Sequence, residues 1–132
     1  MAAGAAATNE RMLMTTAHRP AGIHLLADLA GIEAGLLTDP GAIDALLREA
    51  ALRAGARILH SHFHTFGPGM GVTGVLLLAE SHISIHTWPE HGFAAADIFM
   101  CGAAQPLLAL DLIERALSPA SRTVRTVERG QL

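Results

Sequence analysis

The chain has 132 residues, enough for one domain with one modest hydrophobic core. Hydrophobic residues make up 51% of it and charged residues 16%, so we expect most of the chain to fold. The net charge of −3, without any run of basic residues, argues against a nucleic-acid partner. No apolar run approaches the ~18 residues of a membrane span. The N-terminus lacks the order of a secretory signal, so we expect a cytoplasmic protein with no membrane partner.

Two features of the composition exclude particular cofactors and metal sites. A single cysteine, Cys101, excludes an intrachain disulfide and any zinc site with several thiolates. All 9 basic residues are arginine, so the chain cannot hold pyridoxal phosphate on a lysine or bind phosphate through a P-loop lysine. Carbonyl chemistry on an amine substrate would therefore need a carbonyl from another source.

The first half of the chain predicts a tail, a strand and a helix. Residues 1–20 are rich in alanine and show no period, so we expect a mobile N-terminal tail. Residues 22–29 suit a first strand. Asp39 and Pro40 indicate a helix start, because Asp caps helix N-termini and Pro is favoured at the first helical position. Gly55 is expected to end this helix. Its apolar residues recur at intervals of three and four: Ile43, Leu46, Leu47, Ala50 and Ala54.

The second half predicts four strands, a helix and a last strand. Turn residues separate the four strands: residues 57–65, 72–79, 81–88 and 93–100. Gln105 and Pro106 open a helix that runs to about Leu117. Three of its apolar residues are expected to share one face: Leu108, Leu112 and Ala116. Residues 123–127 alternate as a strand. The order predicts one α+β domain over residues 21–132, a two-layer α/β sandwich with a largely antiparallel sheet and two helices on one face.

One predicted strand carries three histidines at alternate positions, His60, His62 and His64, which therefore share a face. Neutral imidazole is a common metal ligand, and His82 and His86 are expected two strands away. Alternating histidines are not a specific zinc spacing, however, and no carboxylate lies close to them in the sequence. An ordinary polar strand face with one histidine in a site is the better explanation, and we predict no metal site.

A second cluster of reactive residues occupies positions 80–90. Ile83 and Ile85 alternate and are expected to face the core. A half-buried strand explains that alternation but not the density of Ser, His, Trp and Glu in so short a segment, so we predict a functional site here. Ser81 with a histidine would make a nucleophile and a base, although no Gly-x-Ser-x-Gly elbow surrounds it. Cys101 is either a small buried hydrophobe or, near a histidine, a thiol of tuned reactivity.

Together these residues resemble the family of prokaryotic S-adenosylmethionine decarboxylase proenzymes. The resemblance rests on the block Glu80-Ser-His-Ile-Ser-Ile-His-Thr-Trp-Pro-Glu90 and on the segment 92–102 that follows it. It extends from about Gly22 to Gly130 and includes His64-Thr-Phe66 and Gly71-Val-Thr-Gly-Val75.

The resemblance implies that the chain makes its own cofactor. In this family the chain cuts itself between the residues that match Glu80 and Ser81, giving a β chain (1–80) and an α chain (81–132). The serine hydroxyl attacks the preceding carbonyl, and elimination from the ester leaves a pyruvoyl group on the new N-terminus. That group takes the substrate amine as a Schiff base and acts as the electron sink, a task that otherwise needs lysine-bound pyridoxal phosphate. A tight turn between strands is a suitable place for a strained, cleavable peptide.

The resemblance also implies a role for five further residues. His86 is the base of the processing reaction, and Thr73, where the family usually has serine, supports processing. Cys101 is the proton donor to the substrate α carbon. Phe66 and His86 sandwich the adenine, which stacking stabilises by ~1–3 kcal/mol. Glu90 holds the ribose hydroxyls.

The implied activity is conversion of S-adenosylmethionine to its decarboxylated form, the aminopropyl donor of spermidine and polyamine synthesis, by a homodimer of αβ units. Three alternatives remain open: the same chemistry on arginine or ornithine, a non-enzymatic histidine-rich metal-binding module, and an unprocessed partner subunit. Phe66 and Glu90 favour the nucleoside substrate, because an amino acid needs neither stacking nor a ribose contact. Three features depart from the family: a longer loop at 67–71, His91 in place of an aromatic residue, commonly tyrosine, and the tail before Arg19.

Overall fold

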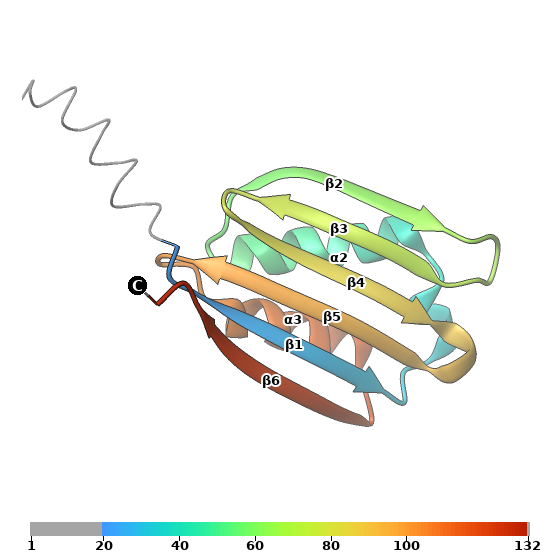
Figure 1. The fold of residues 1–132 in the computed structure, drawn as a ribbon. Helices are drawn as coiled ribbons and strands as arrows, with labels where there is room; N and C mark the ends of the chain where they lie inside the picture. The colour runs from blue at the N-terminus through green and yellow to red at the C-terminus, as the bar shows by residue number, and fades with distance from the viewer. Residues whose placement is uncertain (1–19, 132) are drawn as a thin grey trace, which may run out of the picture.

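Six antiparallel strands form one sheet in the computed structural model, which describes residues 20–131 (Figure 1). In chain order they are β1 (Gly22–Ala30), β2 (Ile58–Thr65), β3 (Val72–Leu78), β4 (Ser81–Trp88), β5 (Phe93–Cys101) and β6 (Ser121–Arg129). Across the sheet the order is β2-β3-β4-β5-β1-β6. The helices α2 (Pro40–Arg53) and α3 (Pro106–Leu117) lie side by side on one face (Figure 1). The predicted two-layer α+β sandwich is confirmed.

Two short 3-10 helices, η1 (Ala34–Leu37) and η2 (Pro89–His91), complete the described part of the chain. They lie in segments for which the sequence predicted only a connection and a turn. The tail predicted over residues 1–20 falls, apart from Pro20, outside the described residues.

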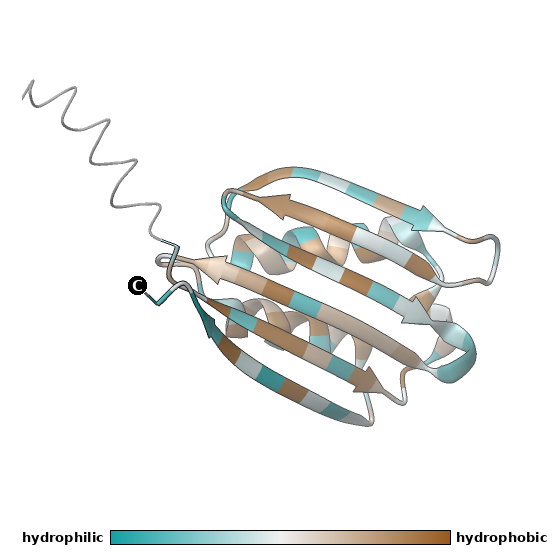
Figure 2. Ribbon diagram, in the orientation of Figure 1, coloured by the Kyte–Doolittle hydropathy of each residue, from teal (hydrophilic) through white to brown (hydrophobic). Residues whose placement is uncertain are grey.

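Alternation along the strands divides the sheet into a buried face and an open face. Hydrophilic and hydrophobic residues alternate along β4 and β6 (Figure 2). On β4 the side chains of Ile83 and Ile85 are fully buried beneath the helices, as predicted. The histidines and serine between them, His82, Ser84 and His86, therefore point to the face that no helix covers.

The start of α2 follows its sequence signals. The Asp39 carboxylate accepts hydrogen bonds from the backbone N–H groups of Gly41 and Ala42, at 3.0 and 3.2 Å, and Pro40 is the first helical residue. Gly55, at φ 87°, follows the last turn as predicted. The helix is therefore held at both ends by local chemistry that the sequence displays.

The three residues predicted to share a face of α3 do so, but that face is not the most buried one. Leu108, Leu112 and Ala116 line a groove between α3 and α2. The buried residues of α3 are Pro106, Ala109, Leu110, Ile113 and Leu117. Because leucine, isoleucine and alanine occupy most positions of this helix, its apolar periodicity does not distinguish one stripe from its neighbour.

The last strand is longer than predicted. Residues 123–127 alternate, but β6 pairs with β1 along the whole span from Ser121 to Arg129. Most of its side chains are exposed, so its length comes from backbone pairing with β1 and not from its own apolar pattern. Nη1 of Arg122 donates to both carboxylate oxygens of Glu114, at 2.7 and 2.8 Å, and so ties β6 to α3.

The buried side chain of Thr87 on β4 makes hydrogen bonds to the backbone of two other segments, and these bonds can be tested by substitution. Its side chain is 5% exposed; its hydroxyl donates to the Leu37 carbonyl at 2.7 Å and accepts from the Val72 N–H at 2.8 Å. We expect Thr87→Val to lower the free energy of unfolding by ~1–3 kcal/mol, because both backbone groups lose their partner. Chemical denaturation measures the change. Thr126→Val, an exposed threonine of β6, is the matched control, and equal effects of the two substitutions would contradict the assignment.

Candidate active site

The turn between β3 and β4 carries the predicted cleavage site. Ala79 and Glu80 form a two-residue turn, with Leu78 paired to Ser81 across it. Glu80 has φ 59°, a left-handed backbone that costs a non-glycine residue ~1–2 kcal/mol. Among the described residues only Glu80 and Ser118 are non-glycine residues with positive φ. The predicted tight turn is thus present, and its backbone strain lies on the residue before the predicted scissile bond.

The same turn forms one wall of a cavity of about 400 Å³ at the end of β5. Glu80, Ser81 and Cys101 line it together with mostly small residues: Gly55, Ala56, Arg57, Ala79, Gly102, Ala103 and Ala104. The Cys101 thiol lies 3.6 Å from the Glu80 carbonyl oxygen, to which it donates. The structure therefore brings together the three residues to which the resemblance assigns self-cleavage and proton donation.

Gly22 makes room for this arrangement, a role that no motif in the sequence indicated. It lies opposite Cys101 in the pairing of β1 with β5. A Cβ at this position would lie 2.6 Å from the Met100 carbonyl oxygen and 3.0 Å from the Cys101 sulfur. Only glycine therefore lets β1 pass so close to the cysteine.

The surroundings of Cys101 keep its thiol protonated. Burial raises the pKa of the thiol, and the negative charge of the nearby Glu80 carboxylate raises it further. At neutral pH the group is therefore a proton donor and not a thiolate nucleophile. This state suits the predicted role in protonating a carbon atom.

A second cavity, of about 270 Å³, lies at the other end of β4. It gathers the remaining predicted residues, Phe66, Thr73, His86 and Glu90, with Met70, Gly71, Thr87 and Trp88. The Thr73 hydroxyl is 3.2 Å from Nδ1 of His86, and these residues face each other in the pairing of β3 with β4. Phe66 is 61% exposed, which leaves its ring available to a planar ligand.

One chain does not bring the two cavities together. Ser81 and His86 lie five residues apart on one strand, and at ~3.3 Å per residue the separation of their backbones is roughly 17 Å. No rotation of an imidazole spans that distance. The predicted processing base therefore cannot reach Ser81 of its own chain in this structure.

Between the two cavities a hydrogen-bond network crosses the open face, and the sequence did not predict it. The Asp97 carboxylate on β5 accepts from Nε2 of His24 at 2.6 Å, from Nε2 of His82 at 2.8 Å and from the Ser84 hydroxyl. Burial alone would raise the pKa of Asp97, but the hydrogen bonds from Ser84, His24 and His82 outweigh it and hold the pKa below its usual value. Asp97 is therefore ionised at neutral pH.

His24, His82 and Asp97 are also the one group of metal-type side chains within ligand distance in residues 20–131. The Arg129 guanidinium donates to Nδ1 of His24 at 2.9 Å, so the proton of neutral His24 resides on Nε2. A metal ion at Nε2 would require that proton to move to Nδ1, against Arg129. The histidines of β2, His60, His62 and His64, are exposed on the edge strand and stand apart from this group.

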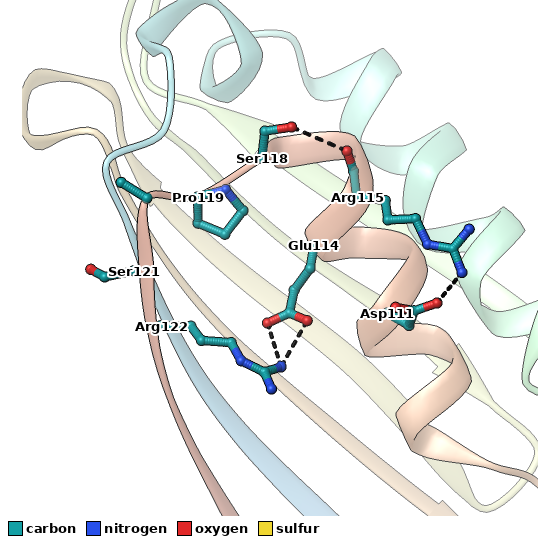
Figure 3. Close-up of a pocket in the computed structure, with 8 residues that line it drawn as sticks. Asp111, Glu114, Arg115, Ser118, Pro119, Ser121 and Arg122 are labelled. Carbon is teal, nitrogen blue, oxygen red and sulfur yellow. Dashed lines mark hydrogen bonds and ion pairs between the residues drawn. The ribbon is translucent and has the colours of Figure 1, made fainter.

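A third cavity, of about 350 Å³, lies where α3 ends and β6 begins (Figure 3). Ion pairs join Glu114 to Arg122 and Asp111 to Arg115 at its wall (Figure 3). None of the predicted site residues lines it.

No helix in the described part of the chain is long and apolar enough to cross a membrane.

Comparisons with known proteins indicate the same family as the sequence motifs. A family model described as S-adenosylmethionine decarboxylase matches residues 23–130. The S-adenosylmethionine decarboxylase proenzyme of Persephonella marina is 46% identical over 110 residues, 83% of this chain and 82% of that protein. The proenzyme of Caldicellulosiruptor saccharolyticus is 41% identical over 110 residues, 83% of this chain and 88% of that protein.

Two solved structures are similar to the chain. The adenosylmethionine decarboxylase from Aquifex aeolicus has a TM-score of 0.78 at 41% identity, covering 87% of this chain and 95% of that one. A Trypanosoma brucei AdoMetDC monomer has a TM-score of 0.59 at 15% identity, covering 77% of this chain and 44% of that one, and shows a shared fold alone. The resemblance stated from the sequence is confirmed.

Cys101 allows a direct test of the site electrostatics because it is the sole cysteine of the chain. We expect the alkylation rate of the folded Ser81→Ala chain to rise at a higher pH than that of the same chain unfolded in urea, because burial and Glu80 raise the pKa of the thiol. Adding Glu80→Gln should move the inflection to lower pH, whereas Glu49→Gln, a remote exposed control, should not. An inflection at or below that of the unfolded chain would contradict the assignment.

Proposed function

Because the chain belongs to the S-adenosylmethionine decarboxylase family, we propose that it is a self-processing enzyme that decarboxylates S-adenosylmethionine to the aminopropyl donor of spermidine synthesis. The observation that best supports this is the cavity at the start of β4. There a serine follows a left-handed glutamate and lies beside a protonated cysteine. The cytoplasmic location expected from the sequence stays a prediction.

Self-cleavage requires the Ser81 hydroxyl to attack the carbonyl carbon of Glu80. The strained turn raises the energy of the intact peptide, so conversion to the ester relieves part of that strain. A base must then remove the α proton of residue 81, and His86 is the residue that we assign to this step. Thr73, hydrogen-bonded to Nδ1 of His86, would fix the orientation of the ring.

The surroundings of residue 81 fit a pyruvoyl group. The cavity has room for a substrate amine beside the strand start, and its walls are mostly small side chains. The pyruvoyl group supplies a carbonyl that accepts the substrate amine and withdraws electrons as carbon dioxide leaves. Cys101, kept as a thiol, would then deliver its proton to the substrate α carbon.

The second cavity supports a nucleoside substrate. Phe66 presents an exposed ring in the same cavity as His86, and Glu90 contributes a carboxylate to it. An adenine would stack between the two rings, and the ribose hydroxyls would donate to Glu90. Arginine and ornithine contain no flat base or ribose and would leave these groups without a partner, so the alternative substrates are not favoured.

The separation of the two cavities supports a homodimer of αβ units. Each chain carries Ser81 and Cys101 at one end of the sheet and His86 and Glu90 at the other. Large apolar residues remain exposed on the open face, which a second copy would cover: Leu26 at 41%, Leu77 at 45%, Trp88 at 40% and Val127 at 39%. Two open faces packed about a twofold axis, with their β4 strands running in opposite directions, would place His86 of one copy beside Ser81 of the other.

Mixing two inactive chains tests both the cleavage and the dimer. Ser81→Ala alone should remain one uncut chain, because the nucleophile is lost, and His86→Ala alone should cleave much more slowly, by ~10²-fold or more. When the two are refolded together, the His86→Ala chain should be cut, since the Ser81→Ala copy provides the missing imidazole. A denaturing gel with intact masses identifies which chain is cleaved.

Cleavage of the Ser81→Ala chain would refute the serine assignment. No rescue in a mixed sample that contains heterodimers would refute His86 acting between copies, and it would leave the decarboxylase assignment to be decided by activity on S-adenosylmethionine.

Glu90→Gln tests the substrate class. With S-adenosylmethionine we expect kcat/KM to fall at least tenfold, equivalent to ~1.4 kcal/mol, because the ribose hydroxyls lose a charged acceptor. Cleavage should be unaffected. The methyl sulfonium of methionine, which lacks the nucleoside, should be a poor substrate that the substitution leaves nearly unchanged. Equal losses on both substrates would show that Glu90 supports the site in general and does not hold the ribose.

A further inference from the structure

The network centred on Asp97 joins four strands on the open face. Arg129 on β6 donates to His24 on β1, His24 donates to Asp97 on β5, and His82 and Ser84 on β4 donate to the same carboxylate. The central members of the network are half-buried: the side chains of His24, Asp97 and His82 are 15%, 20% and 34% exposed. The cleavage chemistry described above uses none of these side chains.

The protonation states of the network are fixed by its chemistry. Arginine only donates, so Nδ1 of His24 accepts and its Nε2 carries the proton that reaches Asp97. The carboxylate therefore accepts three hydrogen bonds, from three different side chains. A charged acceptor with three donors holds the donating side chains firmly in place, since each charge-assisted hydrogen bond is about twice as strong as a neutral one.

The position of the network relates it to the cleavage site. His82 directly follows Ser81, and Asp97 lies on the strand that ends at Cys101. His82 and Phe99 face each other in the pairing of β4 with β5. His82 also contacts the Phe99 ring, and its bond to Asp97 is the first side-chain hydrogen bond after residue 81 that ties β4 to the strand carrying the proton donor.

Cleavage changes what holds residue 81. In the uncut chain the turn at Ala79 and Glu80 restrains it from one side and β4 from the other. After cleavage residue 81 is a chain end, and chain ends fray unless side chains anchor them. Proton transfer in contrast needs a fixed geometry, and a displacement of about 1 Å can reduce a rate roughly a hundredfold.

Resting on the proposed function, we propose that the contact between His82 and Asp97, braced by His24 and Arg129, positions residue 81 beside Cys101 once cleavage has made residue 81 a chain end. His82 and Asp97 are positioning residues that act through the backbone of β4. Because the intact turn already restrains the uncut chain, their contribution is specific to the mature enzyme.

Hydrogen exchange of residues 82–88 in cut and uncut chains tests this proposal without measuring activity. The substitution is Asp97→Asn, because asparagine has the size of aspartate but no charge, and its amide group is a poor partner for two ring N–H donors. In the mature chain we expect Asp97→Asn to speed exchange at the start of β4 by about tenfold or more. In the Ser81→Ala chain, which stays uncut, the same substitution should change exchange by less than about threefold.

Kinetics and N-terminal sequencing of the α chain provide further readouts. In the mature Asp97→Asn enzyme kcat should fall by about tenfold or more with little change in KM. The substitution leaves substrate binding intact but disturbs the position of residue 81 relative to Cys101. If the proton reached the pyruvoyl-derived carbon instead of the substrate α carbon, hydrolysis by water would release the decarboxylated substrate as an aldehyde and leave alanine at the N-terminus of the α chain. The fraction of α chain that can be sequenced should therefore rise with turnover. Glu49→Gln is the control, since Glu49 is exposed on α2 and lies away from the open face.

The outcomes separate this proposal from the proposed function. If Asp97→Asn speeds exchange equally in cut and uncut chains, or in neither, the network is an ordinary part of the sheet and the positioning role is refuted while the decarboxylase assignment stands. If the unaltered chain is never cut, the proposed function fails first and this proposal fails with it. His82→Leu, which leaves Asp97 two donors, repeats the comparison if Asp97→Asn does not fold.

Discussion

The antiparallel register of β4 between β3 and β5 is the constraint on which the site depends. Leu78 faces Ser81 across the two-residue turn, and His82 faces Phe99. A slip by one residue would turn the fully buried Ile83, and Ile85 with it, to the open face, and burial of each such side chain stabilises the fold by ~1.5–3 kcal/mol. Hydrophobic packing on the helix side therefore sets the position of Ser81 relative to Cys101 on β5.

The same register places strain where the proposed chemistry would use it. The favoured two-residue turns place at least one residue at positive φ, and here that residue is Glu80 and not a glycine. Its cost of ~1–2 kcal/mol is smaller than the gain from burying the two isoleucines of β4, so the core keeps the turn in place. Glycine at this position would make the same turn without strain. The glutamate thus combines a higher-energy peptide with a carboxylate that keeps Cys101 protonated.

The sequence predicted the sandwich, but it assigned to one site residues that the structure places in two separate cavities. The alternation in β4 and the cap at Asp39 are local signals, and the structure follows them. The contact of His24 with Asp97 joins residues 73 positions apart and depends on β1 pairing with β5, an order that no local pattern encodes. The resemblance assigned Ser81 and His86 to one reaction, although the strand predicted over residues 81–88 holds both, and five residues of extended chain span roughly 17 Å. How the two side chains could meet depends on contacts beyond this strand, which no local pattern encodes.

The pKa values of two acidic groups on β5, the Asp97 carboxyl and the Cys101 thiol, are shifted in opposite directions. The two shifts define the pH range in which Asp97 is charged and Cys101 is protonated. Asp97 has a lowered pKa because three donors outweigh its burial, so the stability that it contributes is present at neutral pH and is lost as the pH falls through its folded pKa. Cys101 has a raised pKa because of burial and Glu80, so folding is penalised only as the pH rises through the range where an unfolded thiol ionises. Between these limits the anchor is charged and the donor is protonated. One strand thus holds an ionised acceptor and an un-ionised donor at the same pH because their neighbours differ: hydrogen-bond donors surround one, and a carboxylate lies beside the other.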